Sequence, residues 1–240
     1  MVDTKSNSYT FIFAVIVCVI CGVTLSAFTE GLRKQQELNA ELDVKKNILK
    51  AVVLTHPLAP KMPGKEILEV YDRKIEEVVI DTQGNVVEGK KPAELTEGDK
   101  NLHPLYLYKE EGKILAYAFP ISGQGLWSTL YGYLALEADA ITVRGITFYK
   151  HGETPGLGGE IEKDWFQNNF KGKTIYSIKE KRLTPTIVVK GKAVDQYKNE
   201  ELKYHVDGIT AATLTGLGVT EMLERWLKAY EPFFSKQRKT

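Results

Sequence analysis

The sequence predicts an α+β protein, with an N-terminal transmembrane helix, a mixed domain containing antiparallel strands, and a C-terminal helix. Three observations predict this class. They are an uncharged run at residues 6–29, short β-branched segments between turn residues in the middle, and a helical repeat of apolar residues near the end. Strands and helices do not alternate regularly along the chain, and no internal repeat is present. This distribution is typical of α+β proteins rather than of parallel α/β folds.

The first predicted element is the uncharged run from Ser6 to Thr29. As a helix at about 1.5 Å per residue it is about 36 Å long, enough to cross the roughly 30 Å hydrocarbon core of a membrane. A cleaved signal peptide, with small residues at Ser26 and Ala27, is the alternative, but the run is long for one and Asp3 precedes it. Because both flanks carry basic residues, charge does not decide which side of the membrane the remaining chain occupies.

The next segment, residues 30–56, is predicted to be an amphipathic helical connector. From Leu32 to Val53, leucines, valines and Ile48 recur among polar residues without Gly or Pro. His56-Pro57 and the stretch from Pro60 to Gly64 are predicted to end this helix. The chain therefore divides into residues 1–29 with the transmembrane helix, the connector at 30–56, and a soluble domain at 57–240.

The first half of the soluble domain is predicted to form strands, because β-branched and aromatic segments alternate with turn signals. Gln83-Gly84-Asn85 marks one turn, Glu110-Glu111-Gly112 marks a hairpin, and Asp139 lies near a further turn. The predicted strands are Ile75–Ile80, Leu105–Lys109, Lys113–Pro120, Leu130–Glu137 and Ile141–Tyr149.

The second half of the soluble domain begins with a segment rich in Gly and Pro, from Tyr149 to Lys163, which predicts a tightly turning loop. A short helix is predicted at Trp165 to Phe170 and a buried strand at Thr186 to Lys190. Apolar residues then recur with i, i+3, i+4, i+7 spacing, which predicts a terminal helix from Gly216 to Phe234.

Composition and charge exclude several classes of protein. The 240 residues include 32 Lys+Arg and 31 Asp+Glu, and this net charge of +1 argues against a nucleic-acid partner. Both cysteines, Cys18 and Cys21, lie in the predicted membrane helix, so the soluble part has no disulfide, thiolate metal site or cysteine nucleophile. No Rossmann, P-loop or hydrolase pattern is present. No metal site is predicted either, and four histidines are interpreted as ordinary polar surface residues: His56, His103, His151 and His205.

The segment from Asp207 to Gly216 carries the strongest chemical signal. It combines a carboxylate, hydroxyls and small residues just before the predicted terminal helix. Exposed N–H groups and the positive end of the helix dipole favour an anion at such a place, and the dipole contributes about 0.3–1 kcal/mol. From spacing alone, an ordinary helix start capped by Thr213 or Thr215 is the alternative.

Part of this segment, Asp207-x-x-Thr210-Ala211-Ala212-Thr213, is similar to the Asp-x-x-(Ser/Thr)-Gly-Ala-Thr motif, at which FMN is attached through its phosphate. Three further segments resemble the same family in order and spacing: Gly125–Gly132, Gly145–Tyr149 and His151–Gly158. Together with the N-terminal anchor, they make nearly the whole chain resemble the C subunits of sodium-translocating NADH:quinone reductases, the FMN-binding subunits of respiratory sodium pumps.

The resemblance implies that FMN is bound covalently, as a phosphoester of Thr213, by a flavin transferase that takes it from FAD with a metal ion. It also implies that Asp207 and Thr210 orient the loop or assist this modification. Ala212 and Thr215 are expected at the site, with Thr215 as the competing acceptor. Ala211 stands where the family usually has Gly. If the position needs φ > 0, Ala is strained by about 1 kcal/mol, and we expect slower or weaker flavinylation at most.

The resemblance further implies that the loop from Glu153 to Gly158 lies against the isoalloxazine ring, within a flavin-binding core at about residues 115–234. A rigid turn packed on the sheet is the alternative for this loop. A neighbouring pair, Trp127 and Ser128, is a candidate for the flavin edge or a partner interface, and a core tryptophan is the alternative there. Leu157 is expected to cover a ring face and Glu153 or Thr154 to bond to ring heteroatoms. The residues expected near the ring are Glu153, Thr154, Leu157, Gly158, Trp127 and Ser128.

The function implied by the resemblance is electron transfer by a membrane-anchored subunit of a multisubunit NADH:quinone oxidoreductase that exports sodium. Its partners would be the other subunits and the flavin transferase, and it would have no turnover alone. The expected location is the cell inner membrane, single-pass, with the soluble domain on the extracytoplasmic side. The nearest alternative is the equivalent flavoprotein subunit of an Rnf-type, ferredoxin-linked complex. A cofactor-free anchored assembly module is the alternative from another class.

Overall fold

The computed structural model describes residues 7–53, 63–96 and 98–238. The chain forms two compact units, Met1–Val44 and Lys45–Thr240. The first unit is helical, and the second combines an antiparallel sheet with helices. The predicted α+β class, with a long N-terminal apolar helix and a C-terminal helix, is therefore confirmed.

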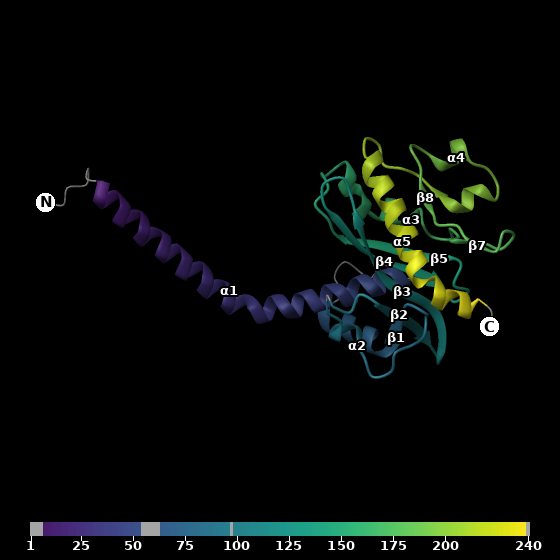
Figure 1. Cartoon of the computed structure of the whole chain (residues 1–240), viewed down its shortest axis with the longest axis horizontal. Helices are drawn as coiled ribbons and strands as arrows, with labels where there is room; N and C mark the ends of the chain where they lie inside the picture. Colours follow the sequence, from purple (N-terminus) through teal and green to yellow (C-terminus); the bar gives the residue numbers. More distant parts are fainter. Residues whose placement is uncertain (1–6, 54–62, 97, 239–240) are drawn as a thin grey trace. The chain divides into compact units, whose positions relative to one another are not determined.

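The first helix, α1 (Asn7–Val52), runs without a break from the predicted membrane segment into the predicted connector, as far as Val52 (Figure 1). It contains an 18-residue window of mean hydropathy 2.7, none of it buried, so α1 is long and apolar enough to cross a membrane. Its final turns belong to the second unit, where Ile48 and Leu49 are fully buried. The predicted helix end at His56-Pro57 and Pro60–Gly64 lies outside the described residues, except for Pro63 and Gly64.

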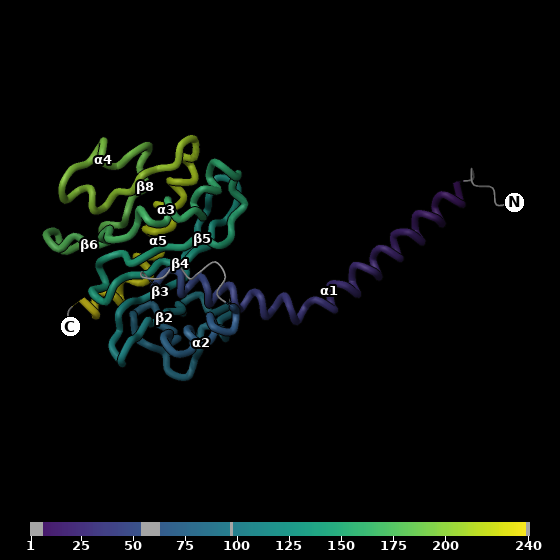
Figure 2. Tube along the Cα trace, turned by 180° about the vertical axis from the view of Figure 1, so that it is seen from behind, coloured from purple at the N-terminus to yellow at the C-terminus, as the bar shows by residue number. Residues whose placement is uncertain are grey.

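The second unit is built on a five-stranded antiparallel sheet in the order β1-β2-β3-β4-β5 (Figures 1 and 2). All five strands occur where the sequence predicts them. The two-residue loop between β2 and β3 has φ of 49° at Glu111 and 77° at Gly112. Positive φ at both positions is the type I′ geometry that matches strand twist, so the predicted hairpin is confirmed. The strands are β1 (Ile75–Asp81), β2 (Leu102–Glu110), β3 (Lys113–Gln124), β4 (Thr129–Glu137) and β5 (Val143–Lys150).

Helices cover both faces of this sheet, because alternate side chains of each strand point to opposite sides. One face carries large apolar residues, such as Phe119 and Ile121, which form the core under the terminal helix. The other face carries buried tyrosines and alanines, such as Tyr106 and Ala118. It is covered by α2 (Gly64–Lys74) and the last turns of α1, which Figure 2 shows in front of the sheet.

The terminal helix α5 (Thr213–Gln237) lies across β3 on the face seen in Figure 1. It begins three residues before the predicted start at Gly216 and continues through Pro232. The Tyr230 hydroxyl donates to the Pro104 carbonyl at 2.6 Å, and the Trp226 indole N–H donates to the Ser122 carbonyl at 2.7 Å. These part-buried contacts fix where the C-terminal half of α5 lies beside the sheet.

The remaining elements of the second unit are short. The short helix predicted at Trp165 is present as α3 (Asp164–Asn168). The buried strand predicted from Thr186 to Lys190 is wrong in extent. β8 is only Ile187–Val188, and Ile187 is 40 % exposed. Pro185 has no N–H to extend the pairing, and Gly191, with φ of 80°, turns the chain away. β8 pairs in parallel with β9. The other short elements are η1 (Pro92–Glu94), η2 (Gly158–Glu162), β6 (Tyr176–Ser177), β7 (Arg182–Leu183), α4 (Ala193–Gln196), η3 (Glu201–Tyr204) and β9 (His205–Val206).

Candidate functional site

Three segments far apart in sequence meet at the N-terminal end of α5: the loop between β3 and β4, the loop after β5, and the first turn of α5 itself. Glu153, which is only 5 % exposed, joins them. One carboxylate oxygen, Oε1, accepts the backbone N–H of Trp127 at 2.9 Å and that of Ser128 at 3.4 Å. The other, Oε2, accepts the Thr215 hydroxyl at 2.6 Å and the Leu126 N–H at 3.3 Å. A single side chain therefore holds both loops onto the helix.

Glycines allow this close approach. A Cβ on Gly158 would lie 2.5 Å from the Thr215 hydroxyl and 2.6 Å from Glu153 Oε2, and one on Gly125 would lie 2.7 Å from Glu153 Oε1. A Cβ on Gly218 would lie 2.2 Å from the Gln124 carbonyl oxygen. These separations are well inside van der Waals contact, so larger residues would push the three segments apart.

The Glu153 carboxylate is held in its charged form. Burial raises its pKa, but the hydrogen bonds from Thr215 and from the backbone N–H groups of Trp127, Leu126 and Ser128 together lower the pKa below its ordinary value. These described partners are all neutral donors. The site therefore contains a buried negative charge that is solvated by protein dipoles.

The start of α5 has no side-chain cap. Ala212 occupies the N-cap position and makes no side-chain hydrogen bond, and the first turn contains no acidic residue. Thr213 is the first helical residue and is exposed, whereas Thr215 is buried and bonded to Glu153. Neither threonine caps the helix, so the alternative of an ordinary Thr-capped helix start is wrong. The positive end of the dipole remains available to an anion.

The turn before α5 shows the backbone conformation of Ala211, which stands where the family motif usually has Gly. The Ala212 N–H donates to the Ile209 carbonyl at 3.1 Å, which places Ala211 at the third position of a four-residue turn. Ala211 has φ of 59°. Positive φ at that position strongly favours Gly, so the strain expected from the sequence is present, at about 1 kcal/mol.

The other motif residues anchor or flank this turn. Asp207 Oδ1 accepts the Ala193 N–H at 2.8 Å, which ties the turn to α4. The Gly208 N–H donates to the Gly191 carbonyl at 2.8 Å. Thr210 is exposed and Ala212 is buried. The structure thus brings Asp207, Thr210, Ala212 and Thr213 into one compact turn.

The rim of the site is apolar and exposed. Trp127 is 69 % exposed, so the alternative of a core tryptophan is wrong. Leu157 is 40 % exposed, and Thr154 beside it is exposed, with its carbonyl accepting the N–H groups of Leu157 and Gly159 at 3.1 and 3.0 Å. The Ser128 hydroxyl accepts the Gly152 N–H at 2.5 Å and so joins the two loops a second time. Sequence reasoning missed three further exposed apolar residues on these segments: Leu126, Leu214 and Leu217.

His151 is not the surface residue that the sequence suggests. Its side chain is only 12 % exposed. Nδ1 accepts the Glu153 N–H at 3.2 Å, and Nε2 lies 3.6 Å from the Glu162 carboxylate. His151 therefore stabilises the loop that contains Glu153. Its position between two glycine-bearing loop segments was the available signal in the sequence.

Two other histidines, His103 and His205, pack against aromatic rings. His103 lies against the rings of Trp226 and Tyr230, with centroids 6.1 and 5.5 Å away, and burial lowers its pKa. His205 stacks on Tyr197 at 3.6 Å. His56 lies outside the described residues. Within the described ranges, no group of three or more His, Cys, Asp or Glu residues is arranged to hold a metal ion.

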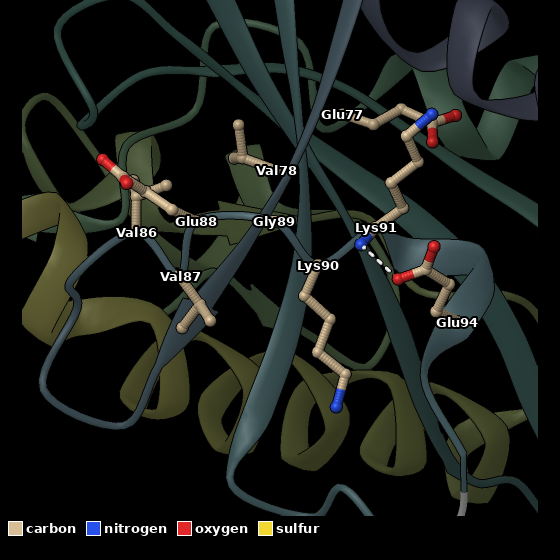
Figure 3. A pocket seen from close by; sticks show the side chains of 9 residues that line it. All are labelled: Glu77, Val78, Val86, Val87, Glu88, Gly89, Lys90, Lys91 and Glu94. Carbon is tan, nitrogen blue, oxygen red and sulfur yellow. Dashed lines mark hydrogen bonds between the residues drawn. The ribbon is translucent and has the colours of Figure 1, made fainter.

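A pocket of about 320 Å³ lies elsewhere, along β1 and the loop after it (Figure 3). It is lined by Glu77, Val78, residues 86–91 and Glu94, none of which is a predicted site residue. Two of its charged groups already have partners, because Lys90 binds Asp99 at 2.6 Å and Glu77 accepts the Tyr71 hydroxyl at 2.7 Å. The predicted site residues therefore lie at the start of α5 rather than in this pocket.

The residues at the start of α5 fit a flavin nucleotide. An exposed hydroxyl, Thr213, stands at an uncapped helix N-terminus that suits a phosphate. The exposed apolar side chains of Trp127 and Leu157, on the two loops joined by Glu153, suit a flat aromatic ring. An anionic tether and an aromatic group are the two parts of FMN.

Comparison with known proteins also indicates an FMN-binding protein. The chain matches a family described as an FMN-binding domain over residues 125–228. It is 31 % identical over 265 residues to the C subunit of the Na(+)-translocating NADH-quinone reductase of Pseudomonas aeruginosa, covering 100 % of this chain and 99 % of that relative. It is 34 % identical over 251 residues to the protein of the same name from Vibrio campbellii, covering 92 % and 91 %.

Solved structures of similar proteins have the same fold. The crystal structure of the corresponding protein from Parabacteroides distasonis, also a C subunit of this reductase, superposes with a TM-score of 0.72 at 31 % identity, covering 85 % of this chain and 97 % of that one. Shewanella oneidensis NqrC gives a TM-score of 0.66 at 24 % identity, covering 82 % and 97 %. The second likeness concerns the fold alone.

Proposed function

The chain belongs to the C subunits of the Na(+)-translocating NADH-quinone reductases, and from this premise we propose that it carries FMN covalently, as a phosphoester of Thr213, and transfers electrons within that complex. Membership in this family sets aside the Rnf-type alternative. The FMN-binding domain at residues 125–228 sets aside the cofactor-free assembly module. The observation that carries the proposal is the exposed Thr213 hydroxyl at the uncapped start of α5.

Thr213 is a better acceptor than Thr215, the competing hydroxyl two residues on. Thr215 is 1 % exposed, and its hydroxyl donates to Glu153 at 2.6 Å. Modification of Thr215 would break that bond and place a phosphodiester beside a buried carboxylate, which like-charge repulsion opposes. Thr213 is exposed, so a transferase can reach it without unfolding the site.

The chain's own residues would hold the two ends of the cofactor in different ways. The N–H groups of the first turn of α5 favour the phosphate. Trp127 and Leu157 would cover the ring, with Thr154 and Gly158 beside them. Thr210, Asp207 and Ala212 would present the turn to the flavin transferase. The bound flavin supplies one-electron acceptance and donation, while the protein fixes its place and potential.

The apolar helix and the covalent link to FMN both suit an extracytoplasmic domain. The apolar part of α1 would hold the chain in the inner membrane as a single span, next to the other subunits of the complex. A cofactor bound without a covalent link would dilute away outside the cytoplasm, whereas a phosphoester keeps it at a fixed place. By itself the protein would turn over no substrate, because NADH is oxidised elsewhere in the complex.

The test is co-expression of the full chain with a flavin transferase, followed by denaturing gel electrophoresis and flavin fluorescence. The wild-type band should fluoresce, Thr213→Ala should be dark, and Thr213→Ser, which keeps a hydroxyl, should recover part of the signal. A dark wild-type band would refute covalent attachment. Fluorescence that survives in Thr213→Ala would assign the acceptor to another residue.

A further inference from the structure

We propose that Glu153 is a positioning residue, whose buried carboxylate holds two loops on the first turn of α5 and whose charge lowers the redox potential of the cofactor held there. The second half of this inference rests on the proposed function. The first half concerns the protein alone. Glu153 lies 62 residues from Thr215 and 25 to 27 residues from its three backbone donors, so it links distant parts of the chain.

Both carboxylate oxygens are engaged by the protein. A carboxylate is an acceptor with about four lone-pair sites. The N–H groups of Leu126, Trp127 and Ser128 and the Thr215 hydroxyl supply four donors, at 3.3, 2.9, 3.4 and 2.6 Å. Glu153 therefore acts on a ring through the loops it holds, rather than by bonding to ring atoms itself.

Two of the residues that Glu153 positions form the exposed rim. It binds the backbone of Leu126 and Trp127, whose side chains are 43 % and 69 % exposed. Through Thr215 it also holds the helical turn that begins with Thr213. Losing this one side chain would release the loop that carries Trp127 from the turn that carries the acceptor hydroxyl.

The carboxylate also contributes a fixed charge. Its described hydrogen-bond partners are neutral donors, so no described cation cancels it at close range. A buried negative charge is screened far less than a surface one. It disfavours the arrival of an electron nearby, and charges beside a flavin tune its potential. Neutralising Glu153 should therefore make the midpoint potential more positive.

Three variants separate the charge from the hydrogen bonds. Glu153→Gln removes the charge at nearly constant shape. Thr215→Val keeps the charge and removes one hydroxyl donor, and Thr215→Ser restores that donor. Each is prepared as the full chain in detergent, with and without the transferase, beside the wild type.

Two measurements decide the proposal. Without flavin, hydrogen exchange of the amides at residues 126–128 should be about tenfold or more faster in Glu153→Gln and Thr215→Val than in the wild type, and near wild type in Thr215→Ser. With flavin, the midpoint potential should become more positive in Glu153→Gln and stay closer to wild type in Thr215→Val. Unchanged exchange in the first two variants overturns the positioning role, and an unchanged potential in Glu153→Gln overturns the charge role.

The proposed function and this inference can be refuted independently, because different measurements test them. The flavin content of the wild type tests covalent attachment. If the wild type lacks flavin, the exchange measurement still decides whether Glu153 holds the loops. If Glu153→Gln does not fold, Thr215→Val and Thr215→Ser carry the exchange test with the charge intact.

Discussion

Two neighbouring residues at this site differ in what they contribute: Ala211 has a strained backbone, and Thr213 presents an exposed hydroxyl. Ala211 is held at φ of 59°, in the left-handed region. Thr213, two residues later, is exposed and lies in the uncapped first turn of α5. The Asp207–Thr213 pattern was sufficient to predict a loop that leads into the terminal helix, because these residues are local in sequence. The bond between Glu153 and Thr215 was not predictable, because it depends on how distant segments pack.

Replacing the strained residue gives a prediction at this scale. Ala211→Gly should stabilise the second unit by about 0.5–1 kcal/mol, because relief of left-handed strain exceeds the added backbone entropy of Gly in the unfolded chain. Thermal or urea unfolding of the chain without flavin measures it. Ala229→Gly, in the interior of α5, is the matched control and should instead destabilise by about 0.5–1 kcal/mol. Loss of stability in Ala211→Gly would contradict the turn assignment.

The Glu153 carboxylate also predicts how stability depends on pH. Its pKa is lowered in the folded state, so its contribution is present above its ordinary pKa of 4.5 and is lost as pH falls through the folded value. At pH 7, Glu153→Gln should be less stable than wild type by about 1.5–3 kcal/mol, the value of hydrogen bonds to a charged group. Denaturant unfolding at several pH values should show this difference shrinking below pH 4.5. A difference independent of pH would show that the charge is not responsible.

At the scale of elements, the positions of the strands followed from local chemistry. The hairpin between β2 and β3 was predictable because Glu111-Gly112 supplies two residues that adopt positive φ. The extent of β8 was not, because Pro185 and Gly191 shorten it to two residues despite an apolar run. The start of α5 was misplaced by three residues, since no capping residue marks it.

The contact between α5 and the end of β3 gives the prediction for this scale. Gly218→Ala should destabilise the second unit by about 1–3 kcal/mol, because its Cβ would lie 2.2 Å from the Gln124 carbonyl oxygen. It should also reduce flavinylation, by moving the first turn of α5 away from the loops. Gly98→Ala is the control, since a Cβ there would meet only the Thr96 hydroxyl at 3.6 Å. Thermal unfolding and flavin fluorescence of both variants check this, and equal behaviour would contradict the close packing.

At the scale of the whole molecule, α1 is one continuous helix that begins in the apolar segment and ends in the second unit. The apolar segment was predictable from the absence of charge alone. The role of the final turns of α1 was not, because their burial depends on a sheet formed later in the chain. Ile48, Leu49, Ala51 and Val52 are all at most 2 % exposed. The Ala51 carbonyl packs on Gly145, and the Val52 carbonyl accepts the Arg144 side chain.

Two truncations follow from this packing. A chain beginning at Lys45 should be soluble without detergent and unfold cooperatively, because it retains the whole second unit. A chain beginning at Val53 loses the four buried residues, three of them large, which contribute about 4.5–9 kcal/mol at about 1.5–3 kcal/mol for each large side chain. That is comparable with the whole stability of a domain. Circular dichroism melting curves compare the two, and the same melting temperature for both would show that α1 ends outside the fold.

The central claim, that Thr213 carries FMN, is tested most directly by peptide mass spectrometry. Trypsin should release the peptide from Tyr204 to Arg225, which contains Thr213, its competitor Thr215, and Thr210. After co-expression with the transferase, this peptide should gain the mass of FMN less one water, and its fragments should place the addition on Thr213. An unmodified peptide, or an addition located on Thr215 or Thr210, would contradict the account.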